Sequence, residues 1–263
     1  MIEPLRVADY ARPSHSCQRL VGASPIIGCR PLLENNPRTP AVLPSTARLP
    51  HLVKLYQRYL SNEHTAGFVQ AVSARYSVAT LERIAVQGDR LARRAATMAL
   101  GFLGDNRVSA VLARGLHDAD RGVRILAEAG LREVWCRDGS LSQRQKLRTV
   151  MRLNVAEAFD ETVDAANQLL DEAPSMAEAW NQRAIAYFHL QQYTEAIRDC
   201  GRALEINPHH FAAAVGMAHS HLELNEPYAA LHAFRQALEI NPELEGVRNQ
   251  IQFLEQSLEG RPE

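Results

Sequence analysis

The sequence predicts an all-α fold, an α-solenoid superhelix of stacked helical hairpins, from three observations. The hexapeptide Ala-Leu-Glu-Ile-Asn-Pro occurs at residues 203–208 and again 34 residues later, at 237–242. Apolar residues follow a helical period over most of the chain after residue 50, and β-branched runs bounded by turn signals are absent. A unit of this length buries its apolar face by stacking on copies of itself, and not by closing a single globule.

The first 50 residues contain 8 of the 13 prolines and show no sustained periodicity, which predicts a disordered, proline-rich leader. We expect the protein to be cytoplasmic. A second interpretation rests on the apolar residues 20–28, which follow Arg19 and precede Cys29 as in a bacterial lipoprotein signal. That interpretation would give a lipid anchor at Cys29. We favour the leader, because the apolar run is short and Pro25 interrupts it. No stretch approaches the roughly 20 apolar residues that span a bilayer.

Residues 51–140 contain a shorter repeat of 31 residues, in which Asp89, Arg93, Ala96 and Leu100 recur as Asp120, Arg124, Ala127 and Leu131. We expect each aspartate to cap the second helix of a hairpin, and the arginine four residues later to reach back to it. Residues 91–101 and 120–127 resemble the HEAT repeat, which implies a structural scaffold of stacked hairpins.

Residues 141–244 contain the 34-residue units. The unit at 177–210 resembles the tetratricopeptide repeat (TPR) in Trp180, Ala184, Tyr187, Ala196, Ala203 and Pro208. The unit at 211–244 keeps Ala218, Ala230, Ala237 and Pro242, and a weaker copy occupies 143–176. We therefore expect three TPR-like repeats. They are followed at 245–260 by a capping helix with one apolar stripe, formed by Val247, Ile251, Leu254 and Leu258.

The TPR resemblance implies that the first helix of each hairpin lines a concave groove that binds a protein partner, either a peptide or a helix. The groove positions carry Arg144, Leu147, Met151, Asn154, Asn181, Ile185, Phe188, His189, Val215, His219, Leu222 and Glu223. We expect the apolar residues to fill pockets with partner side chains, and Asn154 and Asn181 to meet the partner's backbone. The alternative is that this strip packs against another helix of the same chain.

One subclass of TPR groove is not expected. Repeats that hold the C-terminal carboxylate of heat-shock chaperones use lysine, asparagine and arginine at set positions. Here those positions carry Leu147, Met151, Gln182, Ala212 and Gly216, so the cations that a carboxylate needs are missing.

The distribution of charge separates the two repeat sections. Residues 51–140 carry 13 basic and 9 acidic side chains, whereas residues 141–263 carry 10 basic and 18 acidic ones. The acidic part argues against nucleic acid as its ligand. Nucleic-acid binding by the HEAT-like section remains an alternative, and it would use Arg90, Arg93, Arg94, Arg121 and Arg124.

Catalytic motifs and metal-ligand spacings are not evident. His219 and His221 are two residues apart on a helix and would point in nearly opposite directions. No Ser/His/Asp order, paired-carboxylate site or glycine-rich phosphate loop stands out. The sequence therefore predicts a non-enzymatic interaction scaffold without metal or cofactor, with a regulatory subunit of an enzyme complex as a further alternative.

Overall fold

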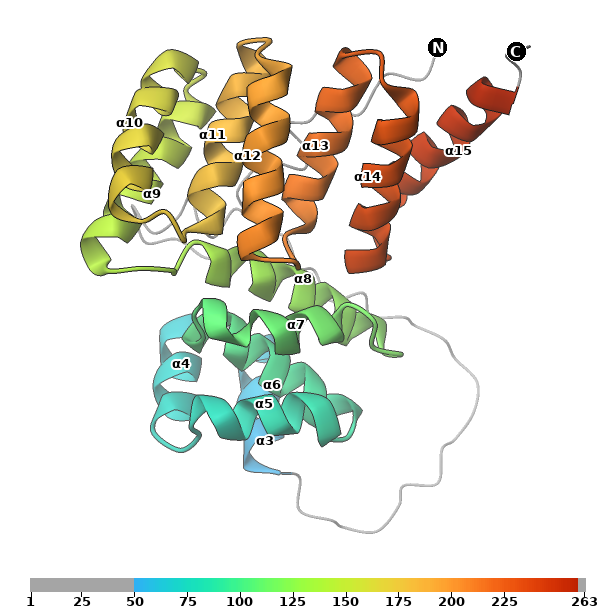
Figure 1. Ribbon diagram of the computed structural model, residues 1–263. Coiled ribbons are helices and arrows are strands. Elements are labelled where there is room, and N and C mark those ends of the chain that lie inside the picture. The colour runs from blue at the N-terminus through green and yellow to red at the C-terminus, as the bar shows by residue number, and fades with distance from the viewer. Residues whose placement is uncertain (1–49, 260–263) are drawn as a thin grey trace.

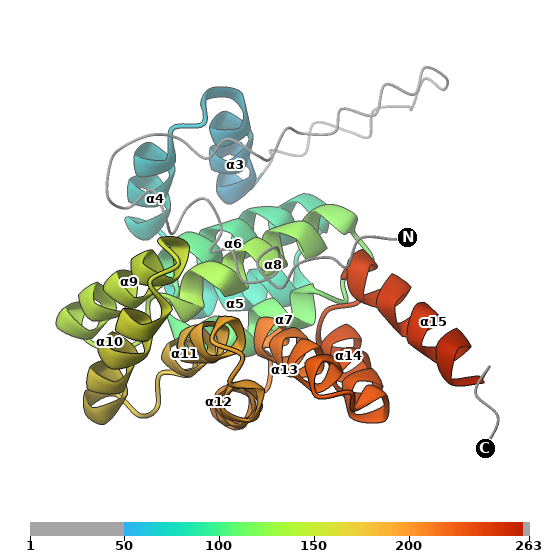
Figure 2. The same ribbon diagram turned by 90° about the horizontal axis from the view of Figure 1, so that it is seen from above.

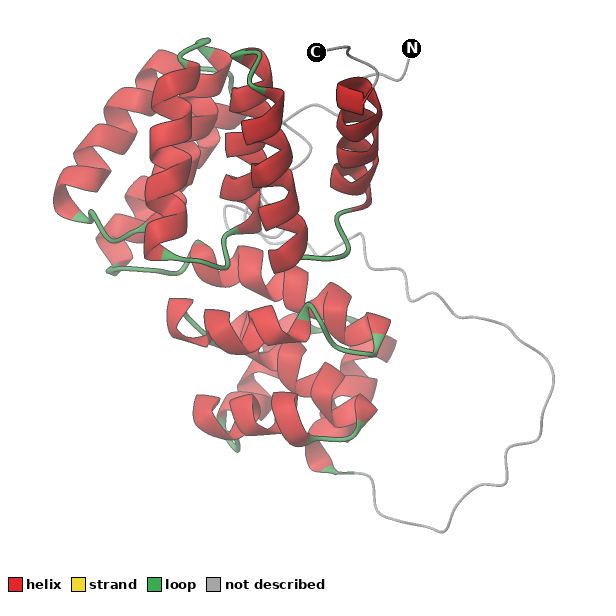
Figure 3. Cartoon of the chain, turned by 45° about the vertical axis from the view of Figure 1, so that its right-hand side comes forward, coloured by secondary structure: helices red, strands yellow, loops and turns green. Residues whose placement is uncertain are grey.

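The computed structural model describes residues 50–259, so the expected leader and the anchor at Cys29 lie outside the described residues. Within this range the chain forms thirteen α-helices and no strand, which confirms the all-α prediction (Figures 1 and 3). The helices are α3 (His51–Asn62), α4 (Thr65–Ser73), α5 (Val78–Gln87), α6 (Arg90–Leu103), α7 (Ser109–Gly115), α8 (Arg121–Trp135), α9 (Leu141–Val155), α10 (Phe159–Glu172), α11 (Ala177–His189), α12 (Tyr193–Ile206), α13 (Phe211–Glu223), α14 (Pro227–Ile240) and α15 (Glu245–Glu259). None of them is long and apolar enough to cross a membrane.

The N-terminal section (residues 51–140) contains the hairpins α5–α6 and α7–α8. Asp89 accepts a hydrogen bond from the amide of Ala92 at 2.9 Å, and Asp120 accepts one from Val123 at 3.0 Å, so the expected helix caps are confirmed. The second helices α6 and α8 pack very closely. A methyl group built on Gly101 would lie 3.0 Å from the Cα atom of Gly130, so this crossing leaves no room for a side chain.

The expected arginine–aspartate pairs within one helix are wrong. Arg93 donates to Asp118 of the next hairpin, with Nε and Oδ2 2.8 Å apart, and Arg94 donates to Asp120 with 2.5 Å between Nε and Oδ1. The carboxylate of Asp89 is already engaged by the helix amide, whereas stacking brings the aspartates of the following hairpin within reach. These ion pairs therefore connect one hairpin to the next and are not formed within a single helix.

The C-terminal section (residues 141–244) consists of the hairpins α9–α10, α11–α12 and α13–α14. Each hairpin turns through one residue in the left-handed conformation, and these residues, Glu157, Gln191 and Asn225, follow one another every 34 positions with φ between 57° and 60°. The turn amides form the same hydrogen bond in all three hairpins, for example from Gln191 to the carbonyl of Phe188 at 3.0 Å. The backbone thus repeats with the period of the sequence.

The two sections share a common core. One cluster of buried apolar side chains extends from Leu52 in α3 to Leu254 in α15, and a smaller one around Leu147 and Leu169 lies between α9, α10 and α11. The link at 136–140 is short, because Ser140 immediately caps α9 through a reciprocal bond with Gln143. After the last hairpin, α15 packs on α14.

Helix α8 joins the sections at both of its ends (Figure 1). At its C-terminus, the ring of Trp135 stacks on that of His210, with centroids 4.0 Å apart, and contacts Phe211 at the start of α13. Near its N-terminus, Arg124 donates from Nε to Oε1 of Glu243, 2.9 Å away; Glu243 lies just before α15. The sections are therefore fixed relative to each other by contacts that are far apart in sequence.

Candidate partner-binding trough

The face formed by α9, α11 and α13 is the candidate site, and we call it the trough. Seen from above, these three helices follow one arc, with α10, α12 and α14 in an outer layer (Figure 2). Contacts of α11 with both α9 and α13 place them as neighbours. All twelve residues expected to line the groove belong to these three helices, so the structure gathers them on adjacent elements.

Burial divides the twelve predicted residues of the trough into an interior group and a more exposed group. Leu147 and Val215 have no exposed surface, and Met151, Asn181 and His219 are less than a tenth exposed. These five residues belong to the interior of the chain, as the alternative interpretation of the strip requires. Arg144, Asn154, Ile185, Phe188 and Leu222 are half-buried, while His189 and Glu223 are exposed. The prediction of a partner groove therefore rests on the second group.

The side-chain amides of Asn154 and Asn181 in the trough donate hydrogen bonds to other residues of the chain. Asn154 donates through Nδ2 to the carbonyl oxygen and to Oε1 of Gln182, at 2.8 and 2.9 Å. Gln182 in turn donates to Oε1 of Glu178 at 2.6 Å, and Asn181 donates to the same oxygen at 3.4 Å. The expected contact of Asn154 and Asn181 with a partner backbone would have to compete with these bonds. The Oδ1 atom of Asn154 is buried, and no described residue donates to it.

This network continues to the junction with α8. His210 is fully buried, and its Nδ1 accepts a hydrogen bond from the amide of Ala213 at 3.2 Å. Its Nε2 therefore carries the proton and donates to Oε2 of Glu178 at 2.8 Å. Because Trp135 stacks on the same ring, the N-terminal section holds the imidazole that orients Glu178 beneath the trough. The trough is thus pre-organised by side chains outside the predicted groove set.

Aromatic rings support the rim, which we define as the last two residues of α9, α11 and α13. His189 stacks on Phe159 with ring centroids 4.5 Å apart, and Phe188 meets Tyr193 edge-on at 5.5 Å. The hydroxyl of Tyr193 donates to Glu223 at 3.4 Å, which joins two neighbouring hairpins. Phe188 is therefore held in place while part of its surface remains exposed.

His219 lies in the interior of the trough and is electrically neutral. Burial lowers its pKa to about 4, its ring meets Phe234 edge-on at 5.2 Å, and no described residue bonds to its Nε2 atom. Among residues 50–259, no three histidine, cysteine, aspartate or glutamate side chains gather as they would around a metal ion.

Sequence reasoning missed Trp135 and His210, and it considered Gln182 only as a position that lacks a carboxylate-binding cation. Repeat arithmetic could place Gln182 on the concave side of α11, at position 6 of its unit. It offers no signal for Trp135 and His210, because they belong to different sections and meet only when α8 crosses beneath α13.

Comparison with known proteins supports the repeat assignment. Family models described as tetratricopeptide repeat match residues 177–210 and 212–244. A TPR repeat-containing protein of Rhizobium etli is 34% identical over 100 residues, which cover 36% of this chain and 49% of the relative. Sperm-associated antigen 1 of Mus musculus is 28% identical over 100 residues, covering 38% of this chain and 11% of that protein. The chain thus spans about half the length of the first relative and about a tenth of the second.

Solved structures with a related arrangement include the first TPR of Spaghetti (RPAP3) bound to an HSP90 peptide. It has a TM-score of 0.45 at 21% identity and covers 46% of this chain and 97% of that one. The TPR2AB domain of yeast Sti1, in complex with an HSP90 peptide, has a TM-score of 0.40 at 17% identity and covers 77% and 93%. From the family matches, this chain is a helical-repeat protein that contains two tetratricopeptide repeats, at residues 177–210 and 212–244.

Proposed function

We propose that the chain is a non-enzymatic scaffold that binds a peptide or a helix of a protein partner in the trough. The observation that carries the proposal is the partial exposure of Ile185, Phe188 and Leu222 on helices that internal bonds already hold in place. Apolar side chains on a rigid concave face give a partner helix or strand pockets for its anchoring residues. Because the trough is ordered beforehand, the partner bears most of the entropy loss on binding.

The test combines selection of ligands with variants of the trough. A displayed random-peptide library is selected on the purified full chain, and enriched peptides are measured by fluorescence polarisation. We expect Ile185→Glu and Leu222→Glu each to weaken binding at least about tenfold, since a buried interface loses one apolar contact and gains an unpaired charge. Tyr228→Glu is the matched control, because Tyr228 is 73% exposed on α14 in the outer layer. Equal binding by all variants would show that the trough is not the site.

A further inference from the structure

The N-terminal section divides its repeated arginines into two groups. Arg93, Arg94 and Arg124 are committed to Asp118, Asp120 and Glu243. A second group, Arg83, Arg90, Arg114 and Arg121, is exposed and forms no ion pair or hydrogen bond with any described residue. We call these four residues the arginine surface.

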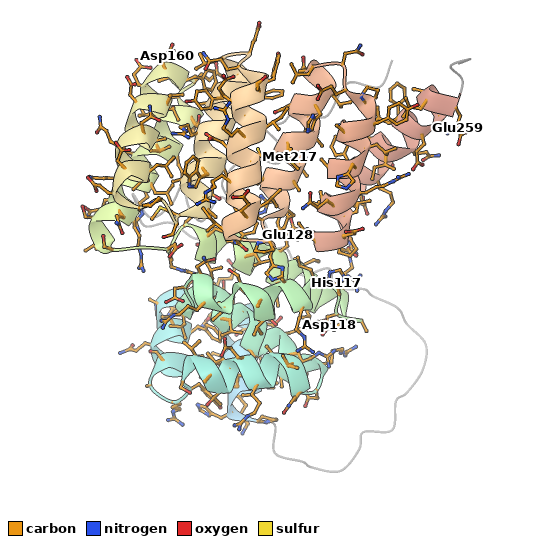
Figure 4. The ribbon with its side chains drawn as sticks, in the orientation of Figure 1. His117, Asp118, Glu128, Asp160, Met217 and Glu259 are labelled. Atoms are coloured by element: carbon orange, nitrogen blue, oxygen red, sulfur yellow. The ribbon has the colours of Figure 1, made fainter. Side chains whose placement is uncertain are left out.

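The members of the arginine surface repeat with the same 31-residue period as the hairpins. Arg83 in α5 corresponds to Arg114 in α7, and Arg90 and Arg121 are the first residues of α6 and α8. The turns α5–α6 and α7–α8 lie at the same end of the section (Figure 1), and Figure 4 shows His117 and Asp118 of the second turn there. Two arginines per hairpin are therefore presented from successive, equivalent positions.

The acids at this end do not cancel the arginine surface. Hydrogen bonds from Arg93 and Arg94 lower the pKa values of Asp118 and Asp120, so both carboxylates stay ionised and paired. Asp89 accepts the cap bond of α6 and forms no ion pair with a described residue, so it offsets only one of the four arginine charges. The charge of Arg90 is a smaller contribution to the lowered pKa of Asp120, which shows that Arg90 lies near the start of α8.

The spacing and the surroundings of the arginines indicate the chemistry of a ligand. Packed helices are about 8–10 Å apart, so equivalent arginines of successive hairpins would match about every third phosphate of a strand, since phosphates follow at about 3.4 Å along the axis. Residues 83–90 and 114–121 contain no Phe, Trp or Tyr. Aromatic side chains stack unpaired bases and often anchor apolar peptides, so their absence favours a ligand that is recognised by its charge.

We propose that the arginine surface binds the phosphodiester backbone of duplex nucleic acid without sequence preference. The site is separate from the trough and uses Arg83 and Arg114 in place of Arg93, Arg94 and Arg124, which are neutralised within the fold. Binding through charge alone is expected to be modest and steeply dependent on salt.

The experiment measures the full chain against a short, labelled DNA duplex of random sequence by fluorescence anisotropy. Four phosphate contacts predict a slope of log K against log salt near about −3.6, and thus a loss of roughly 150-fold between about 50 and 200 mM NaCl. Each of Arg83→Gln, Arg90→Gln, Arg114→Gln and Arg121→Gln should make the slope shallower by about 0.9. The quadruple variant should lose the salt-dependent binding.

Two matched variants sharpen the result. Asp89→Asn keeps a capping side chain but removes a negative charge beside the arginine surface, so affinity should rise about two- to threefold at low salt. Arg198→Gln with Arg202→Gln removes two exposed charges from α12 and should change neither affinity nor slope. Circular dichroism checks that each variant keeps its helices.

Three outcomes would overturn the proposal. They are the absence of duplex binding at about 50 mM salt, a quadruple variant with an unchanged slope, and polyglutamate binding as tightly as the duplex with the same dependence on the four arginines. The last result would assign the surface to acidic polypeptides instead.

Discussion

The two repeat sections share one apolar core but differ in the additional contacts that join successive hairpins. In the N-terminal section, arginine–aspartate pairs run from one hairpin to the next, and α6 and α8 touch through Gly101 and Gly130. In the C-terminal section, small and apolar side chains such as Ala184, Ala218 and Phe211 fill the space between helices. Both sections thus rest on the same close-packed apolar interior, and the N-terminal section adds ion pairs between its hairpins.

Helix α8 shows how the two kinds of packing meet. Arg93 donates hydrogen bonds to the carbonyl of Gly88 and to the carboxylate of Asp118. Arg124 donates in the same way to the carbonyl of Asp118 and to the carboxylate of Glu243. The turn before α15 therefore occupies the place that the turn of a next HEAT-like hairpin would take. The series of arginine–carboxylate pairs, which we call the ionic ladder, thus continues from the N-terminal section into the turn before α15.

The largest expected effect comes from removing the aromatic contacts between the two sections. Trp135→Ala removes the ring that stacks on His210 and contacts Phe211, and should lower the free energy of unfolding by about 3–5 kcal/mol. Urea unfolding followed by circular dichroism measures the loss, and a second transition would show that the sections then unfold separately. Tyr228→Ala, at a 73% exposed position, is the control and should have little effect. A loss below about 1 kcal/mol for Trp135→Ala would mean that the junction contributes little.

The two sections should also differ in their response to acid. His219 has a folded pKa of about 4, below its ordinary value of 6.5, so the unfolded chain takes up a proton first as the pH falls. The stability that its neutral form contributes is complete above pH 6.5 and is lost progressively towards pH 4, by up to about 3 kcal/mol. Asp118 has a lowered pKa because of Arg93, so its contribution is lost only as the pH falls below its ordinary 3.8.

Urea unfolding at several pH values between 7 and 4 tests this difference. The variant His219→Gln should show a shallower loss of stability than the wild type over that range. Asp118→Asn should be less stable than the wild type throughout, with a parallel pH profile until the pH approaches 4. Identical pH profiles for the wild type and His219→Gln would contradict the burial argument.

A smaller effect should report on the ionic ladder. A double-mutant cycle with Arg93→Ala and Asp118→Ala should give a coupling energy of about 1 kcal/mol that decreases with added salt. The matched pair Arg202 and Glu205, whose side chains are 51% and 66% exposed, should give a coupling near zero. Equal coupling in both pairs would remove the distinction between the ladder and ordinary surface charges.

The smallest expected effect concerns the hairpin turns. Glu157→Gly, in the C-terminal section, and Glu63→Gly, after α3, place glycine where φ is 59° and 51°. Each should raise stability by up to about 1 kcal/mol, because a left-handed conformation strains a residue with a side chain. Thermal unfolding measures both, and Glu157→Ala is the control that should bring no gain. Destabilisation by glycine at both turns would show that these side chains contribute more than the strain costs.

Local features of the fold could be predicted from the sequence because short-range rules govern them. The 34-residue period, the caps at Asp89 and Asp120 and the turns all follow from helix periodicity and from backbone bonds between residues at most five apart. The candidate trough was predicted only as a set of positions. Which of its side chains remain accessible could not be predicted, because the burial of Leu147 and Val215 depends on how neighbouring hairpins lean together.

By itself, the sequence determined the helices and their pairing into stacked hairpins. Only the tertiary structure decided which partner each arginine binds, since Arg93 reaches across to Asp118 and Arg124 to Glu243 instead of back along their own helices. It also decided that Trp135 and His210 meet. The physical reason is that a helix is encoded by contacts three or four residues apart, whereas the choice among several carboxylates or rings is made by the spatial arrangement of whole hairpins.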